Sequence, residues 1–261
     1  MSNSPIGLFD SGIGGLTIWK EVVNLLPYEN TIYLADSKNA PYGEKSKEDI
    51  LALSIKNTEY LIKQGCKLIV VACNTATTNA IDYLRANYNI PFIGIEPAIK
   101  PAALQTKNQS VGILATKGTL SSHLFSTTSS IYASNINVTE QIGEGIVDLI
   151  EQGKLHSEEM TLLLNKYIQP MIDANIDYLV LGCTHYPYLI PQLQQLLPDN
   201  VTIIDSGKAI AKQTKKIISE LALFNTNTTN IHHRLHSNLN AQLMETFVAP
   251  NSHIKIEFAD F

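Results

Sequence analysis

The sequence predicts an α/β fold of two similar lobes, each with a mainly parallel sheet flanked by helices, and an active site in the cleft between them. Short runs rich in Val, Ile and Leu alternate with longer helix-like stretches along most of the chain, as parallel β-α-β units require. Two of these runs also end alike: residues 67–72 lead into Cys73 and residues 177–182 into Cys183, each followed by hydroxyl or amide residues. This repetition indicates two related halves.

Short apolar runs bounded by turn-forming residues mark the expected strands. In chain order these are residues 6–9, 31–35, 67–72, 91–95, 110–115, 177–182 and 201–205. The helix-like stretches are residues 15–26, 46–64, 75–88, 119–126, 143–152, 157–174, 187–197 and 207–222. Ser46 and Asp49 resemble a capping box at the start of the second helix, and Gly65 is its expected stop.

The two lobes are expected to come from three stretches of chain. Asp205-Ser-Gly, at the end of the middle stretch, resembles Asp10-Ser-Gly near the start. We therefore expect residues 98–206, which contain Cys183, to form one lobe. Residues 1–97, which contain Cys73, and residues 207–261 would form the other.

Composition excludes several classes of protein. The 261 residues are 44% hydrophobic and 16% charged, which is ordinary for a globular protein with a large core. The net charge is -5 and no dense basic cluster occurs, so a nucleic-acid partner is not expected. No apolar run approaches the roughly 20 residues that span a bilayer, and the first residues lack signal-peptide features. We expect a cytoplasmic protein without a membrane partner.

The cysteines are too few and too scattered for a disulfide framework or a structural zinc site. There are three, and none forms a Cys-x-x-Cys pair. Cys66 precedes its strand and is expected to be a small half-buried side chain. Cys73 and Cys183 follow theirs, at the carboxyl ends where open α/β sheets bind ligands. One such cysteine could simply pack in the core, but two in matching contexts favour a pair of thiols facing one substrate.

Each of the two thiols is also expected to precede a helix. Asn74, Thr75 and Thr184 are good N-cap residues, and Pro187 suits a first helical turn. The N–H groups and partial positive charge of a helix N-terminus favour a thiolate and can bind a substrate carboxylate.

Other polar residues follow expected strands. The glycine-rich segment of residues 10–15 is either an anion-binding loop or a tight turn from strand to helix; it is not a complete dinucleotide or P-loop motif. Asp36 follows the second strand, and Tyr42 would present its hydroxyl at the tip of a fixed loop. His185 lies two residues after Cys183 and is a candidate for proton transfer. Residues 232–236 contain three histidines without supporting ligands, and we expect these to be structural or exposed.

Five segments together resemble glutamate racemase of the aspartate/glutamate racemase family. They are Gly7-Leu-Phe-Asp-Ser-Gly-Ile-Gly-Gly-Leu16, Ala40-Pro-Tyr-Gly-Glu-Lys-Ser46, Val71-Ala-Cys-Asn-Thr-Ala76, Ile95-Glu-Pro-Ala98 and Leu181-Gly-Cys-Thr-His-Tyr-Pro187. The resemblance runs from about residue 6 to residue 210, and the two cysteine segments are specific in combination.

The resemblance implies a homodimeric enzyme that interconverts L- and D-glutamate without a cofactor or metal and supplies D-glutamate for peptidoglycan. One thiolate would remove the Cα proton while the opposite thiol donates one; Cys73 would act on D-glutamate and Cys183 on L-glutamate. It implies that Asp10 assists Cys73, that His185 assists Cys183, and that Asp36 and Glu151 are further acids. Glu144 competes with Glu151 for its role. The implied substrate contacts are Asp10, Ser11, Pro41, Tyr42, Gly43, Cys73, Asn74, Thr75, Thr116, Thr119, Cys183, Thr184 and His185.

Three alternatives remain at this stage. An aspartate racemase would share the fold and the paired cysteines, although the Cys183-Thr-His segment argues against it. A non-catalytic amino-acid-binding protein would keep its affinity without the thiols. A thiol redox protein would require Cys73 and Cys183 to form a disulfide.

Overall fold

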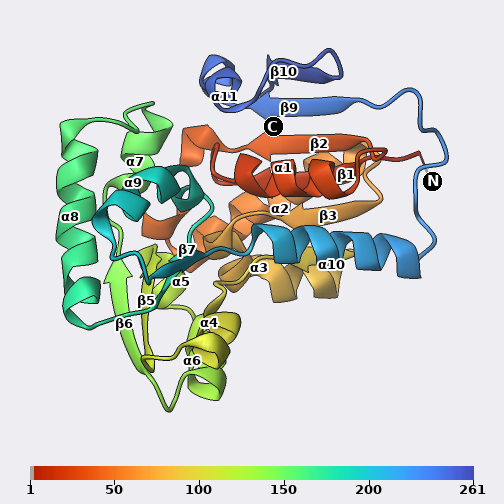
Figure 1. The fold of residues 1–261 in the computed structure, drawn as a ribbon. Helices are drawn as coiled ribbons and strands as arrows, with labels where there is room; N and C mark the ends of the chain where they lie inside the picture. Colours follow the sequence, from red (N-terminus) through yellow and green to blue (C-terminus); the bar gives the residue numbers. More distant parts are fainter. Residues whose placement is uncertain (1–2) are drawn as a thin grey trace.

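Two parallel sheets with helices on both faces of each make up the computed structural model, which describes residues 3–261 (Figure 1). Every paired strand in both sheets runs parallel to its neighbour. The expected α/β class with two mainly parallel sheets is confirmed.

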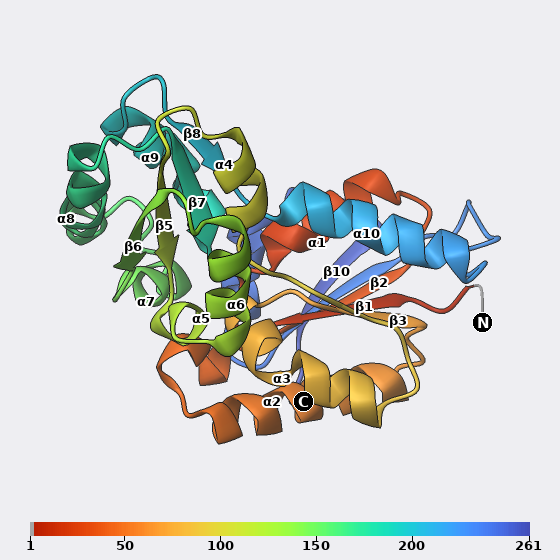
Figure 2. The same cartoon turned by 90° about the horizontal axis from the view of Figure 1, so that it is seen from below.

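The first sheet has six strands. In spatial order they are β10 (Ile254–Phe258), β9 (His233–Ser237), β2 (Thr31–Ala35), β1 (Ile6–Asp10), β3 (Leu68–Val71) and β4 (Phe92–Gly94). Helices α1 (Leu16–Leu25) and α10 (Gly207–Glu220) cover one face, and α2 (Lys47–Lys63) and α3 (Asn74–Asn87) cover the other (Figure 2). Strand side chains alternate between these layers: Leu8 packs in the same cluster as Trp19 of α1, and Phe9 in the same cluster as Ile50 of α2.

The second sheet has four strands from the middle of the chain. Their spatial order is β6 (Asn137–Ile142), β5 (Ser110–Ala115), β7 (Tyr178–Gly182) and β8 (Thr202–Ile204). One face packs on α8 (Glu158–Asp173), and the other on α4 (Ile99–Gln105) and α6 (His123–Tyr132) (Figure 2). Apolar residues on both faces explain why β5 and β7 are nearly continuous hydrophobic runs.

The chain passes between the sheets after β4 and again after β8. The two crossings are tied together where the Ser206 hydroxyl donates to the backbone oxygen of Glu96. Because both sheets are parallel, β1, β3 and β7 all end at the junction of the sheets (Figure 1). The polar residues that follow these strands are therefore brought together.

All seven expected strands are present within one residue of their expected ends. Three further strands were not expected, because their sequences are polar or charged: Asn137–Ile142, His233–Ser237 and Ile254–Phe258. Strands β6 and β10 are sheet edges, where polar side chains reach water. Strand β9 is internal, and its polar side chains find partners, as where His233 Nδ1 lies 2.9 Å from Thr31 Oγ1.

The helices differ from expectation mainly in how they begin and divide. Helices α4 and α11 (Ala241–Phe247) were not expected. The helix expected over residues 119–126 is two short helices, α5 (Lys117–Leu120) and α6, and that over 143–152 is shortened to α7 (Ile146–Glu151). The one expected over 187–197 begins as a 3-10 turn, η3 (Tyr186–Leu189), and continues as α9 (Ile190–Leu196).

Two local predictions are confirmed at α2. The Ser46 hydroxyl accepts a hydrogen bond from the backbone N–H of Asp49 at 3.1 Å and donates to its carboxylate at 2.7 Å. Gly65 follows the helix with a left-handed φ of 77°, a conformation that favours glycine.

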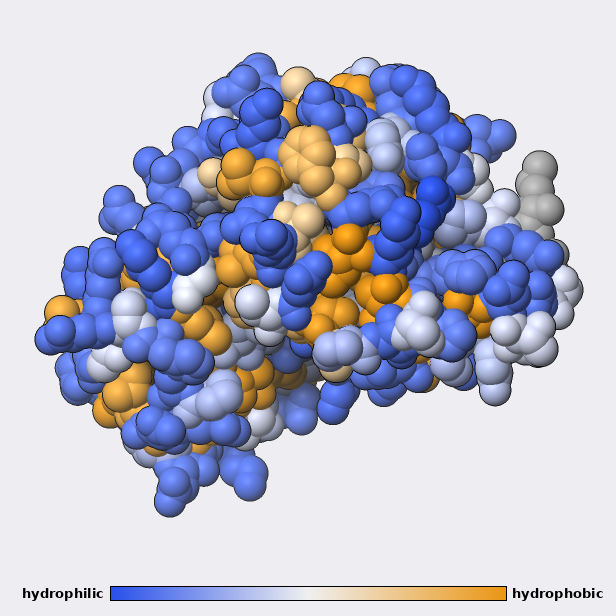
Figure 3. Space-filling model, turned by 90° about the horizontal axis from the view of Figure 1, so that it is seen from above, coloured by the Kyte–Doolittle hydropathy of each residue, from blue (hydrophilic) through white to orange (hydrophobic). Residues whose placement is uncertain are grey.

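Most of the face shown in Figure 3 is hydrophilic, with separate apolar patches toward its centre. Across residues 3–261, none of the helices combines the length and the apolar character needed to cross a bilayer.

Candidate functional site

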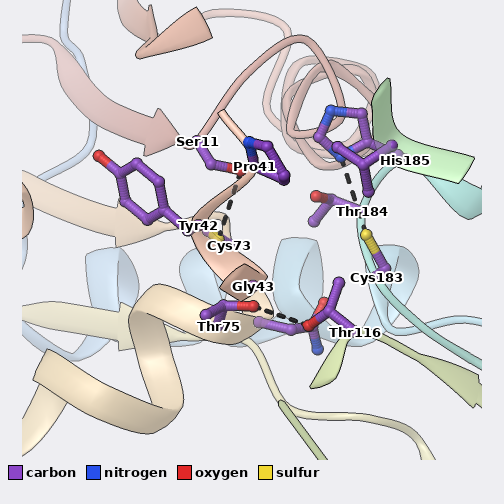
Figure 4. A pocket seen from close by; sticks show the side chains of 12 residues that line it. Ser11, Pro41, Tyr42, Gly43, Cys73, Thr75, Thr116, Cys183, Thr184 and His185 are labelled. Carbon is purple, nitrogen blue, oxygen red and sulfur yellow. Dashed lines mark hydrogen bonds between the residues drawn. The ribbon is translucent and has the colours of Figure 1, made fainter. Parts of the chain in front are cut away.

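A small cavity lies at the junction of the two sheets (Figure 4). Its lining consists of Ser11, Pro41, Tyr42, Gly43, Cys73, Asn74, Thr75, Thr116, Val147, Cys183, Thr184 and His185. All of these except Val147 were expected at the site from the sequence. Asp10 and Thr119 were also expected, but they are buried next to the lining and do not form part of it.

The two thiols lie on opposite sides of this cavity (Figure 4). Cys73 comes from the end of β3 in the first sheet, and Cys183 from the end of β7 in the second. All three cysteines of the chain are free. A small ligand in the cavity would therefore have one thiol on each side.

Cys73 itself is the N-cap of α3, a position that Asn74 and Thr75 were expected to fill. Its sulfur accepts a hydrogen bond from the backbone N–H of Ala76 at 3.4 Å and lies 3.8 Å from the Ser11 hydroxyl. Burial nevertheless raises the pKa of Cys73 well above its ordinary value, and the charge of Asp10 adds to this. The N–H group at the helix N-terminus acts in the expected direction and favours a thiolate at Cys73, but burial has the larger effect on this pKa.

Cys183 has an imidazole as its partner. Nδ1 of the buried His185 lies 3.8 Å from the Cys183 sulfur. Burial by itself would lower the pKa of His185, but its hydrogen bonds to Cys183 and Glu151 raise that pKa well above the ordinary value. The His185 imidazole, whose protonated form these two contacts favour, therefore lies next to the second thiol.

Glu151 completes this side of the site from the end of α7. Its Oε1 lies 2.7 Å from His185 Nε2. The same carboxylate accepts hydrogen bonds from the backbone N–H of Ile13 at 2.6 Å and from the Ser37 hydroxyl at 2.8 Å. Glu144, its competitor in the sequence, is exposed, and its backbone oxygen accepts a hydrogen bond from the Tyr167 hydroxyl at 3.0 Å.

Asp10 closes the glycine-rich loop and links the sheets. Its carboxylate accepts hydrogen bonds from the backbone N–H groups of Gly15 at 2.8 Å and Gly12 at 3.3 Å, and from the Thr184 hydroxyl at 3.2 Å. Burial raises the pKa of Asp10 to about 6, although the charge of His185 and the Gly15 N–H act against this rise. Asp10 affects Cys73 through its charge and donates it no hydrogen bond.

The glycines of residues 12–15 make room for the other half of the molecule. A Cβ on Gly12 would lie 1.9 Å from Glu151 Oε1, and one on Gly14 would lie 2.2 Å from His185 Nδ1. The loop N–H groups of Gly12, Ile13 and Gly15 already bind the carboxylates of Asp10 and Glu151. The loop is thus a tight turn that binds two internal anions.

Tyr42 lines the cavity, but its hydroxyl points away from it (Figure 4). The hydroxyl donates to the carboxylate of Asp36 and accepts from Asn57 Nδ2 at 3.1 Å. The expectation of a hydroxyl presented at the loop tip is therefore wrong. Asp36 does not line the cavity and forms no hydrogen bond with either thiol within residues 3–261.

Hydroxyl groups from both halves meet on another wall. Thr75 Oγ1 lies 2.9 Å from Thr116 Oγ1 (Figure 4). Thr116 Oγ1 in turn lies 3.0 Å from Thr119 Oγ1. The buried Asn74 amide nitrogen has no hydrogen-bond partner among the described residues, so it is available to a ligand.

The histidines near the C-terminus are structural or exposed, as expected. His232 is exposed, whereas His233 and His236 are buried in β9. Burial lowers the pKa of His233 to about 4, so it is neutral at physiological pH.

Comparison with known proteins agrees with this geometry. The family model described as Asp/Glu/Hydantoin racemase matches residues 16–214. A glutamate racemase from Herpetosiphon aurantiacus is 45% identical over 229 residues, which cover 88% of this chain and 90% of that one. The solved glutamate racemase of Francisella tularensis, in complex with D-glutamate, is 31% identical with a TM-score of 0.84 and 98% coverage of both chains.

The solved glutamate racemase of Escherichia coli, in complex with L-glutamate and the activator UDP-MurNAc-ala, is 33% identical with a TM-score of 0.83. The match covers 94% of both chains. The family model spans well over half of this chain, and the sequence relative covers most of it. The chain belongs to the Asp/Glu/Hydantoin racemase family.

Proposed function

We propose that the protein interconverts L- and D-glutamate by proton transfer between two thiols, and that it needs no cofactor or metal to do so. The observation that carries this proposal is the position of Cys73 and Cys183 on opposite sides of one small cavity. The substrate class is supported by the relatives, which are glutamate racemases. The D-glutamate formed would serve peptidoglycan synthesis.

The two thiols account for both proton transfers of the reaction. A thiolate on one face of Cα takes the proton, and the electron pair of the broken C–H bond passes into the carboxyl group. The thiol on the other face gives its proton to Cα, and the stereocentre is inverted. The two cysteines then have exchanged protonation states, which is the starting state for the reverse reaction.

The surroundings of the two thiols support different starting roles. We take the starting state to have a thiolate at Cys183, beside His185, and a protonated thiol at Cys73, whose pKa is raised by burial. This state can take the proton from L-glutamate with Cys183 and return one with Cys73. Action on D-glutamate requires the opposite state. Asp10 and Glu151 set the charge around each thiol, and we assign Asp36 a supporting position behind Tyr42.

The cavity also suits an amino acid with two carboxylates. Hydroxyls of Ser11, Thr75, Thr116 and Thr184 and the amide of Asn74 surround the thiols, and such groups can orient carboxylates and an ammonium. Thr119 would support this wall from behind Thr116. We further propose that residues 1–97 with 207–261 and residues 98–206 move as two lobes, which close over the substrate and exclude water.

Incubation with L-glutamate in deuterated water tests the reaction. We expect loss of optical rotation together with deuterium at Cα of the product, because the donated proton comes from a thiol that exchanges with solvent. L-Aspartate in place of L-glutamate should react far more slowly. Activity that disappears on exhaustive chelation and returns with a metal ion would contradict the two-thiol mechanism.

Three further features of the proposal concern the location, assembly and partners of the enzyme. We expect a cytoplasmic homodimer with no nucleic-acid partner, in keeping with the net charge of -5. Light scattering on the eluting protein during gel filtration tests the dimer.

A further inference from the structure

Strand β9, which polar residues conceal in the sequence, ends next to the candidate site. It pairs with β2 so that Ser237 lies opposite Ala35. The next residues, Asn238 and Asp36, therefore leave the sheet side by side. Asn238 is buried, and its Nδ2 donates to Asp36 Oδ1 at 2.5 Å.

Asn238 binds the site loop at two points. Besides its hydrogen bond to Asp36, its Oδ1 accepts from the backbone N–H of Lys38 at 2.9 Å. Lys38 belongs to η1 (Ser37–Asn39), the turn that precedes the cavity-lining residues 41–43. One amide thus fixes both the carboxylate and the backbone at the start of this loop.

Asp36 connects Asn238 to the cavity wall through further hydrogen bonds. Its Oδ1 also accepts from Asn39 Nδ2 at 2.8 Å, and its Oδ2 accepts from the Tyr42 hydroxyl. Tyr42 is buried and receives a further hydrogen bond from Asn57. The ring is held at its hydroxyl end, so the side that lines the cavity cannot shift while these bonds persist.

We infer that Asn238 is a positioning residue for substrate binding, acting through Asp36 and Tyr42 on residues 41–43. This inference rests on the proposed function, because it concerns the same cavity. Loss of the Asn238 amide leaves a buried Asp36 oxygen and the Lys38 N–H each short of one partner, which loosens the loop. A looser wall weakens binding of substrate and transition state alike, so KM rises while kcat changes little.

The test compares Asn238→Ala with Asn240→Ala, a control two residues away. Asn240 caps α11 through the N–H of Leu243 and is exposed, so its loss affects stability without touching Asp36. We expect Asn238→Ala to raise KM for glutamate about tenfold in both directions, with kcat within about twofold. Asn240→Ala should lower Tm and leave KM unchanged.

A double-mutant cycle with Tyr42→Phe tests the route. That substitution removes the hydroxyl that joins the ring to Asp36, so it and Asn238→Ala interrupt one connection. We expect the double variant to raise KM by clearly less than the product of the two single effects. KM increases that simply multiply in the double variant would overturn the inference. So would an Asn238→Ala variant whose Tm falls while its KM stays unchanged.

Hydrogen exchange supplies a measure that does not depend on turnover. Amides of residues 37–45 should exchange faster in Asn238→Ala than in the unmodified protein, whereas Asn240→Ala should leave them unchanged. Failure of the proposed function would show as an unmodified protein that does not racemise glutamate. Failure of the positioning inference would show as unchanged exchange in this loop.

Discussion

Glu151 Oε1 lies 2.7 Å from His185 Nε2 and accepts, at 2.6 Å, the backbone N–H of Ile13. One carboxylate thus contacts the imidazole beside Cys183 and also joins α7 to the glycine-rich loop that follows β1. Charge at the thiol and contact between the two halves of the molecule depend on the same side chain.

Replacing Glu151 by Gln should lower kcat/KM about 10- to 100-fold, which corresponds to about 1.4–2.8 kcal/mol. Burial lowers the pKa of His185, and in this variant only the contact with Cys183 would still oppose it, so the loss should be greater at pH 8 than at pH 6. Initial rates across this pH range, in both directions, measure the effect.

Two checks accompany this variant. L- and D-glutamate have equal free energies, so kcat/KM must fall by the same factor in both directions, and a difference would reveal faulty kinetics. Glu144→Gln is the matched control, because Glu144 is exposed and its side chain does not contact His185. A larger loss in Glu144→Gln than in Glu151→Gln would refute the assignment.

Cys73→Ser and Cys183→Ser should each nearly abolish racemisation, because a serine hydroxyl is a far weaker base than a thiolate. Each variant retains one thiol, which can still remove a proton when no proton need return, as with an analogue that eliminates a leaving group from Cβ. The two variants should therefore act on opposite enantiomers of such an analogue, as followed by release of the leaving group.

Cys66→Ser is the control for the thiol variants. Cys66 is buried beside Gly7, outside the cavity, and burial raises its pKa to about 12, so its replacement should leave racemisation within about twofold. If the Cys73 and Cys183 variants act on the same enantiomer, the assignment of opposite faces is wrong.

Gly12→Ala should lower activity about 100-fold, since the new Cβ would lie 1.9 Å from Glu151 Oε1 and must displace it. Displacements of about 1 Å in a catalytic site can cost this much. Steady-state kinetics and Tm together test the idea: a variant with near-normal activity would show that the carboxylate can move at no cost.

The free energy of unfolding should depend on pH through Asp10. Its pKa is about 6 in the folded protein against 3.8 ordinarily, so the folded state binds more protons between these values. Its contribution to stability is fully present below about pH 3.8 and is lost as the pH rises through 6, by at most about 3 kcal/mol.

Urea unfolding of the unmodified protein and of Asp10→Asn from pH 4 to pH 8 isolates this contribution. The stability of the unmodified protein should fall relative to the variant as the pH rises to about 6.5. A difference that stays constant over this range would show that Asp10 titrates normally.

The parts of the fold that apolar residues specify are predictable from the sequence. Strands such as β3 and β7 are buried on both faces, so their composition alone marks them. Strand β9 has two histidines and an arginine in five residues, and only its partners in the folded chain, such as Thr31, make that composition acceptable. The position of Asn238 is hard to predict for the same reason, because the polar composition of β9 obscures the strand that places it.

The sequence predicts site residues whose role depends on their type. It does not predict properties that depend on burial, such as a pKa. Paired cysteines after matching strands identified the cavity. The raised pKa of Cys73 follows from its surroundings in three dimensions, which override the helix N-terminus seen in the sequence. Ser37 follows an expected strand beside Asp36, but only the folded chain shows its hydrogen bond to Glu151. Val147 carries no signal of its own, and only the folded chain shows that it lines the cavity.

The pairing of β2 with β9 joins residues about 200 positions apart, as where Thr31 lies opposite His233. During synthesis, one edge of β2 therefore stays unpaired until nearly the whole chain has been made. Strands β5 to β8 can pair with one another earlier. A chain truncated before residue 233 would keep that apolar edge exposed. Such a fragment would be prone to aggregate by strand addition.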